Sequence, residues 1–194
     1  MDEEKNLEVK EAVPDCNKRY TFADYMTWDD DKRWEIIDGV PFLMSAPTVQ
    51  HQRISGEIYG QLWAFLKGKP CEVFHAPFDV RLNANTTDDT VVQPDIVVIC
   101  DKSIMMKTGC QAAPDMVIEI LSPSNRARDM VLKLELYQRT GIREYWVVDP
   151  EEKIVLLYIM DNGRYYVKPY KETDTAPVYI LEGCTINLAD VFAE

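Results

Sequence analysis

Hydrophobic residues recur along this chain at two different spacings. In the segment 51–66 every third or fourth residue is apolar, which predicts a helix of about sixteen residues. A second helix is expected to start at Ser124 or Asn125, either of which can cap it, and to run to about Thr140. A shorter helix is expected over 21–28, which begins with a capping threonine.

Other stretches have the pattern of strands. Residues 34–44 read as a hairpin around Asp38-Gly39, because this dipeptide between apolar runs is a strong turn signal. The stretches 91–100 and 114–121 are nearly continuous in Val, Ile and Leu, as in strands that are buried on both faces. Further strands are expected at 71–82, 144–149, 153–160, 163–172 and 177–183. This order of elements predicts an α/β (α+β) sandwich with a mixed central β-sheet flanked by helices.

Length and composition fit one globular domain. The 194 residues are 46% hydrophobic and 28% charged, which excludes a fibrous or low-complexity chain. We expect an acidic, frayed tail over 1–18 and a single domain over 19–194. No apolar run approaches the roughly 18 residues of a membrane span, and the acidic start is unlike a signal peptide. These features predict a cytoplasmic protein without a membrane partner.

The cysteines point the same way. All five are widely spaced and form no CxxC pair, so the pattern indicates neither a zinc knuckle nor a redox motif. Cys71 and Cys100 lie in or beside apolar strand-like runs, where a reduced cysteine behaves as a small hydrophobe. We therefore expect reduced thiols in a reducing cytoplasm.

The charge distribution bears on nucleic acid as a partner. A net charge of -12 is unfavourable for a protein that binds nucleic acid, since phosphates are held mainly by Lys and Arg. The carboxylates, however, are concentrated in the first 31 residues and in 172–194, whereas 126–143 is locally basic. A patch that includes Arg126 and Arg128 could still meet a phosphate backbone.

Two carboxylates stand in strands that are otherwise apolar. Asp95 follows Pro94, and Glu119 comes 24 residues later, a distance that allows two neighbouring strands joined by one loop. Burying an unpaired carboxylate is costly, so each needs a partner or a metal. Convergent carboxylates suit an octahedral Mg²⁺ or Mn²⁺ site. A structural alternative stays open, because Pro-Asp is a common turn dipeptide and a strand glutamate is often paired with Lys or Arg.

The helix that follows carries a candidate cation. Asp129, Lys133 and Tyr137 are four residues apart, so all three lie on one helix face. They could form a surface ion pair beside an amphipathic tyrosine. Alternatively, the lysine points into the acid cluster, where it would hold a phosphate oxygen or orient a water molecule.

At these motifs the chain resembles a known family. Asp95 lies in QPDIVVI, Glu119 in VIEILSPSN, and the helix in RDMVLKLELYQRTGIREYWVVDP. The upstream segments YTFADY, WEIIDG, SAPTVQHQRIS and FDVRL agree. Together they resemble the Uma-type family of putative restriction endonucleases, a cyanobacteria-rich branch of the PD-(D/E)XK superfamily. The resemblance covers roughly residues 20–159 and implies a restriction-endonuclease-like fold.

The resemblance also implies roles for individual residues. Asp95 and Glu119 match the two motif acids and would ligate Mg²⁺ or Mn²⁺. The superfamily lysine normally lies two residues after the second acid, where this chain has Leu121. Lys133 in the following helix is the candidate replacement. Glu35 and Asp79 match positions that could complete the metal site, although Glu35 could equally be an ordinary hairpin carboxylate. The remaining candidates, for substrate contacts, are His51 (otherwise a structural histidine), Arg126, Arg128 and Tyr137.

The resulting hypothesis is a metal-dependent endonuclease that hydrolyses DNA phosphodiester bonds, with Asp95, Glu119 and Lys133 as catalytic residues. The superfamily habit of cutting two strands suggests a homodimer. A catalytically inactive nuclease-fold domain that binds nucleic acid or a partner protein is the alternative, motivated by the net charge and by Leu121. A glycosidase or other acid hydrolase with two carboxylates is a third possibility, and it would remain active in chelator.

Overall fold

The computed structural model describes residues 14–15, 17–122 and 129–193. Its centre is a six-stranded sheet in the order β11-β10-β9-β8-β6-β3. The neighbours β8 and β9 are parallel and every other neighbouring pair is antiparallel, so the sheet is mixed, as predicted. Its strands are β3 Glu72–His75, β6 Ile96–Ile99, β8 Met116–Ile120, β9 Glu144–Asp149, β10 Ile154–Asp161 and β11 Arg164–Lys171.

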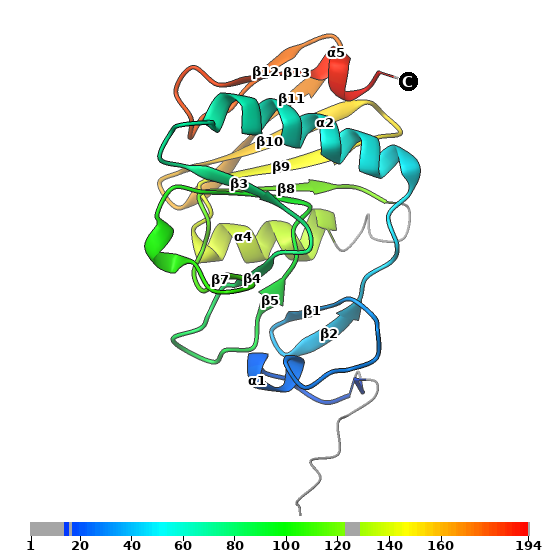
Figure 1. Cartoon of the computed structure of the whole chain (residues 1–194), viewed down its shortest axis with the longest axis vertical. Coiled ribbons are helices and arrows are strands. Elements are labelled where there is room, and N and C mark those ends of the chain that lie inside the picture. Colours follow the sequence, from blue (N-terminus) through cyan, green and yellow to red (C-terminus); the bar gives the residue numbers. More distant parts are fainter. Residues whose placement is uncertain (1–13, 16, 123–128, 194) are drawn as a thin grey trace, which may run out of the picture.

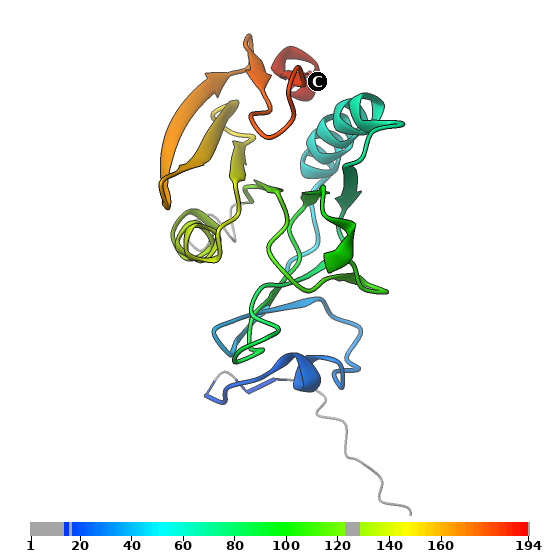
Figure 2. The same ribbon diagram turned by 90° about the vertical axis from the view of Figure 1, so that its left-hand side faces the viewer.

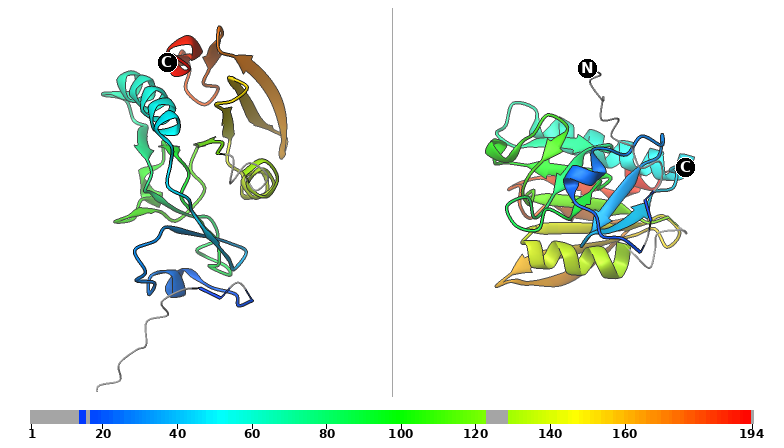
Figure 3. Two further views of the ribbon diagram at one scale, coloured as in Figure 1. Left: turned by 90° about the vertical axis from the view of Figure 1, so that its right-hand side faces the viewer. Right: turned by 90° about the horizontal axis from the view of Figure 1, so that it is seen from below.

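Helices cover this sheet from both sides. Helix α2 (Val49–Leu66) lies on one face, and α4 (Leu134–Thr140), which continues the π-helical turn η2 (Asp129–Lys133), lies on the other (Figure 2; Figure 3). Alternate strand residues face opposite helices. The predicted stripe of α2 packs on one set of them, namely Ile54, Ile58, Leu62 and Leu66 on Ile96, Ile118 and Trp146. The second set packs with α4, namely Val97, Val117 and Val147 with Leu136 and Tyr137.

A second, five-stranded sheet, in the order β2-β1-β5-β4-β7, lies on the α4 side (Figure 1). The predicted hairpin is present, and Asp38 and Gly39 both have positive φ (51° and 77°), as a tight turn requires. The stretches 71–82 and 91–100 each contribute one strand to each sheet and change sheets beside a proline. The strands are β1 Trp34–Ile37, β2 Val40–Leu43, β4 Asp79–Arg81, β5 Val91–Val92 and β7 Gly109–Cys110.

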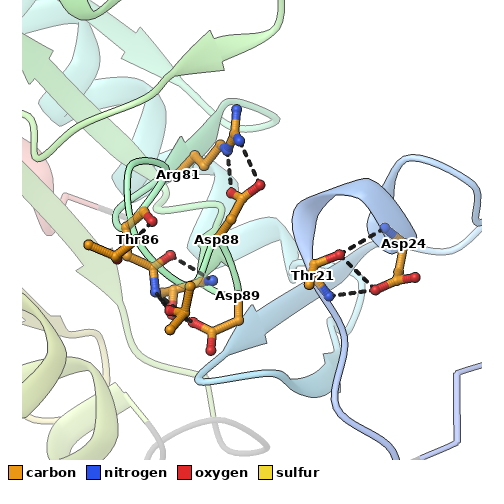
Figure 4. Close-up of polar contacts among 9 residues, drawn as sticks. Thr21, Asp24, Arg81, Thr86, Asp88 and Asp89 are labelled. Atoms are coloured by element: carbon orange, nitrogen blue, oxygen red, sulfur yellow. Dashed lines mark hydrogen bonds and ion pairs between the residues drawn. The ribbon is translucent and has the colours of Figure 1, made fainter.

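The first helix contacts the polar loop after β4, and Figure 4 shows the polar contacts within each of the two segments. Helix α1 is shorter than predicted, Phe22–Tyr25, but Thr21 caps it in a reciprocal capping box with Asp24. Arg81 binds Asp88 through Nε and Nη2, and the Phe22 N–H donates to the Asp88 carbonyl at 2.7 Å. The loop is therefore ordered by its own carboxylates. A 3-10 turn, η1 (Lys102–Ile104), lies between β6 and β7.

The strand predicted over 177–183 is wrong. The chain instead forms two short paired strands, β12 (Thr175–Pro177) and β13 (Thr185–Asn187), with a turn between them, and then α5 (Leu188–Val191). Gly183 in this turn has φ of +76°. The segment is apolar because Val178 and Leu181 pack into the core on the α2 side, not because it joins a sheet.

The expectation of reduced thiols is also wrong for one pair, since Cys71 and Cys100 form a disulfide. Glu72 pairs with Ile99, so the residues just outside this pair face each other, and their Cα atoms are 4.0 Å apart. Cys110 and Cys184 are buried and unbridged, and Cys16 lies outside the described residues. Within the described ranges, no helix is long and apolar enough to cross a membrane.

Candidate functional site

The register between β6 and β8 brings the two motif acids together. Ile96 pairs with Ile118, so Asp95, one residue earlier, and Glu119, one residue later, face each other at the end of the ladder. Oδ2 of Asp95 accepts a hydrogen bond from the Ile120 N–H at 2.8 Å, which fixes this carboxylate against the end of β8. The spacing argument from the sequence therefore placed the two acids on neighbouring strands correctly.

Both acids line one cavity of about 90 Å³, and Lys133 and His51 line it too. The Asp95 side chain is 17% exposed, whereas Glu119 is only 4% exposed as a residue, so the cavity reaches from the surface to a buried carboxylate. The rest of the wall comes from the open end of the β1–β2 hairpin, the first turns of α2 and the end of β3, and includes Arg33, Met44, Gln52, Ser55 and His75.

Lys133 is a buried cation held by two carboxylates. Its Nζ donates to Oε1 of Glu119 at 2.7 Å and to Oε1 of Glu35 at 2.9 Å, and Lys133 and Glu35 are 1% and 0% exposed. The alternative of a surface ion pair is thus wrong for this lysine. Nothing is described of the Asp129 side chain, and Arg126 and Arg128 lie outside the described residues.

Tyr137, one helical turn beyond Lys133, donates its hydroxyl to the same Oε1 of Glu119 at 2.7 Å. It is fully buried and is not part of the cavity wall, so its contact is with the carboxylate. Burial, and then the nearby charges of Glu119 and Glu35, raise the pKa of Tyr137 well above its usual range. The phenol therefore remains a proton donor to Glu119 at any physiological pH.

His51 contacts the other acid. Its Nε2 lies 3.1 Å from Oδ2 of Asp95, and its backbone N–H donates to the Oγ1 of Thr48, the N-cap of α2. The first turn of α2 thus brings an imidazole to the mouth of the cavity.

Gln93, which the sequence reasoning overlooked, links the site to the second sheet. Its N–H donates to Oε1 of Glu35 at 2.9 Å, and its Oε1 accepts from Nε and Nη2 of Arg33 at 2.9 and 2.8 Å. Its Nε2 donates to Oδ1 of Asp79 at 2.8 Å and to the Tyr25 hydroxyl at 3.0 Å. The available signal was a polar residue directly before Pro-Asp in an otherwise apolar run.

The structure therefore separates the two additional acids from the cavity. Glu35, on β1, contacts Lys133 but is not part of the cavity wall. Asp79, on β4, contacts Gln93 and Tyr25 and is likewise outside the wall. Burial and the Asp79 charge raise the pKa of Tyr25, so this tyrosine also stays a donor.

Comparison with known proteins gives a consistent picture. The profile of the family described as Uma2, putative restriction endonuclease, matches residues 22–189. The Synechocystis sp. protein named "Uncharacterized protein slr1290" is 28% identical over 155 residues, covering 78% of this chain and 80% of that protein. The crystal structure of a putative nuclease belonging to DUF820 from Anabaena variabilis superposes with a TM-score of 0.73 at 20% identity, over 90% of this chain and 98% of that one. This likeness confirms the predicted fold class.

Proposed function

The chain belongs to the Uma2 family of putative restriction endonucleases, and we propose that it is a divalent-metal-dependent endonuclease that hydrolyses phosphodiester bonds in DNA. The observation that carries the proposal is the charge of the site. Asp95 and Glu119 line one cavity, and the Lys133 ammonium that also lines it contacts the buried carboxylates of Glu119 and Glu35. Two carboxylates that converge on one cavity, with an ammonium beside them, suit a divalent cation with oxygen ligands.

The residues fit a magnesium-type ion bound with few protein ligands. In the described part of the chain, no group of three or more His, Cys, Asp or Glu side chains is arranged to hold a metal, which argues against a closed protein cage. Mg²⁺ is commonly held by one or two carboxylates, with water and substrate phosphate completing its octahedron. Asp95 and Glu119 would be those two ligands. When bound, the ion would polarise the phosphate and lower the pKa of a bound water.

The chain's own residues prepare the site for that chemistry. The Ile120 N–H and His51 hold Asp95 through one oxygen, Oδ2, and so fix its orientation. Tyr137 and Lys133 hold Glu119 in the same way through Oε1. The Lys133 ammonium supplies positive charge beside the cavity, where the phosphate would gain negative charge in the transition state.

The test is cleavage of supercoiled plasmid, linear duplex and single-stranded DNA with Mg²⁺ or Mn²⁺, by the wild type, Asp95→Asn and Glu119→Gln. We expect each variant to lose at least about a hundredfold in rate, and chelator to abolish activity. The matched control is Glu182→Gln, which changes an exposed carboxylate in the turn before β13 and should leave cleavage unchanged. Wild-type activity in Asp95→Asn, or cleavage that persists in EDTA, would overturn the proposal.

Calorimetric titration with Mn²⁺ provides a second readout that does not require the correct substrate. Heat of binding in the wild type and in Glu182→Gln, but not in Asp95→Asn, would support the proposed ligand.

An inactive nuclease-fold domain that binds DNA is the second candidate, favoured by the net charge of -12 and by a lysine already paired with two carboxylates. It predicts DNA binding without cleavage at any metal concentration. We also propose a homodimer, which light scattering would test.

A further inference from the structure

The basic side chains that line the cavity differ in what they contact. Lys133 is paired with Glu119 and Glu35, and His51 lies against Asp95. Arg33 also lines the cavity, but its guanidinium bonds to the neutral amide of Gln93. Its positive charge is therefore not neutralised by the contacts that hold it.

Those contacts leave part of the guanidinium available. Nε and Nη2 of Arg33 donate to Oε1 of Gln93, which uses two of the five N–H donors of an arginine. For the remaining N–H groups, the described residues provide no hydrogen-bond or ion-pair partner. Arg33 is half-buried, so these donors stand at the border between protein and cavity.

Gln93 fixes the direction of this group. Its amide cannot be flipped without penalty, because its Nε2 donates to the Asp79 carboxylate while its Oε1 accepts from Arg33. The same amide stands between Arg33 and Asp79 and keeps the two charges from pairing directly. The backbone carbonyl of Arg33 accepts a hydrogen bond from the Met44 N–H at 2.9 Å, just beyond the paired residues of β1 and β2. Arg33 is thus fixed both at its backbone carbonyl and at its guanidinium.

The first turn of α2 adds to the positive character of the same cavity. This helix is 18 residues long, its N-cap is Thr48, and His51 and Gln52 from its start line the cavity. A helix N-terminus carries partial positive charge and favours anions. The cavity wall therefore combines a fixed arginine and a helix start with the carboxylates of Asp95 and Glu119.

We propose that Arg33 binds a phosphate group of the nucleic acid in this cavity, and that Gln93 is the positioning residue that orients it. The substrate class rests on the proposed function, but the anion site is argued from Arg33 and its surroundings alone. An arginine presents paired N–H donors that match two oxygens of one phosphate, which a lysine cannot do. Arg33 would thus hold the backbone while the carboxylates take part in the chemistry at the scissile bond.

The experiment measures binding without metal, so that cleavage plays no part. Fluorescence anisotropy in EDTA follows a labelled 20-nucleotide DNA, single-stranded and as a duplex, with the full-length wild type, Arg33→Gln, Arg33→Lys and Arg164→Gln. Arg164 is an exposed arginine at the start of β11, so its variant removes the same charge at a distance from the cavity. Thermal melting confirms that each variant is folded.

We expect Arg33→Gln to bind roughly 10–100-fold more weakly, the loss of a charged hydrogen bond, and Arg33→Lys to fall between it and the wild type. The slope of log affinity against log salt should fall by about 1 in Arg33→Gln. Equal affinity of Arg33→Gln and Arg164→Gln, or no DNA binding by the wild type, would overturn the inference. A wild type that binds through Arg33 but cleaves nothing would support it while refuting the nuclease proposal.

Discussion

Replacing Lys133 with methionine tests the charge balance of the site most directly. Methionine keeps the length and much of the apolar stem of lysine but removes the ammonium. Glu35 and Glu119 would then remain, 0% and 4% exposed, without the cation that contacts both of them. The Tyr137 hydroxyl still donates to Glu119, but a neutral hydrogen bond does not offset two buried charges.

The size of the effect follows from the burial of these groups. Removing one partner of a buried ion pair costs about 3–5 kcal/mol, because the remaining charge is left uncompensated. In a domain of this length, 1 kcal/mol corresponds to about 2–4 °C in Tm, so Lys133→Met should melt about 6–20 °C below the wild type.

Urea unfolding followed by circular dichroism measures this loss. Lys107→Met, which changes an exposed lysine in the loop before β7, should stay within about 0.5 kcal/mol of the wild type. The double variant Lys133→Met/Glu119→Gln should recover part of the stability, because one of the two uncompensated charges is gone. A Lys133→Met protein as stable as Lys107→Met would refute the charge-balance reasoning.

Three further predictions concern the scaffold. Reduction of the disulfide, which closes a loop of 29 residues, should lower the free energy of unfolding by about 3.5 kcal/mol, measured by urea titration with and without a thiol reductant. Gly109→Ala would place a Cβ 1.9 Å from the Asp79 carbonyl and should cost more than about 3 kcal/mol, whereas Gly56→Ala, with open space on α2, should stabilise by about 0.5–1 kcal/mol in the same assay. Burial raises the pKa of Glu144, so its neutral form is favoured in the folded state, and this contribution is lost as pH rises through the folded pKa. As pH rises from about pH 4, the difference in stability between Glu144→Gln and the wild type should therefore shift in favour of the variant, and a difference that stays constant with pH would contradict this.

Periodicity and turn chemistry predicted much of the fold because those signals are local. The α2 stripe, the Asp38-Gly39 turn and the buried runs around Asp95 and Glu119 each follow from residues close together in the chain. The central carboxylates could also be located, because an acid in a strand buried on both faces is out of place unless it has a partner.

The contacts that complete the site are not local, and the pattern did not reveal them. Gln93 joins Arg33, 60 residues away, to Asp79 and Glu35, and these contacts depend on the pairing of β1, β5 and β4 within the second sheet. The disulfide depends in the same way on the register of β3 with β6. The strand prediction for 177–183 failed for a related reason, because an apolar run shows that a segment is buried but not that it is extended.

Lys133 contacts Glu119 from the helical segment that follows β8, not from the strand that carries the acid. Leu121, two residues beyond Glu119, is packed in the core cluster that includes Leu136 and Tyr137 of α4, so this position anchors the helix on the sheet. The helix in turn brings two donors to one oxygen of Glu119, because Lys133 and Tyr137 are four residues apart on one face. A lysine at position 121 would supply the charge from the strand itself but would replace an apolar side chain of this core. Because Lys133 and Tyr137 both come from this helix, the hydrogen bonds to Glu119 depend on how the helix docks, so substitutions that loosen the Leu121 contact should disturb Glu119 without touching it.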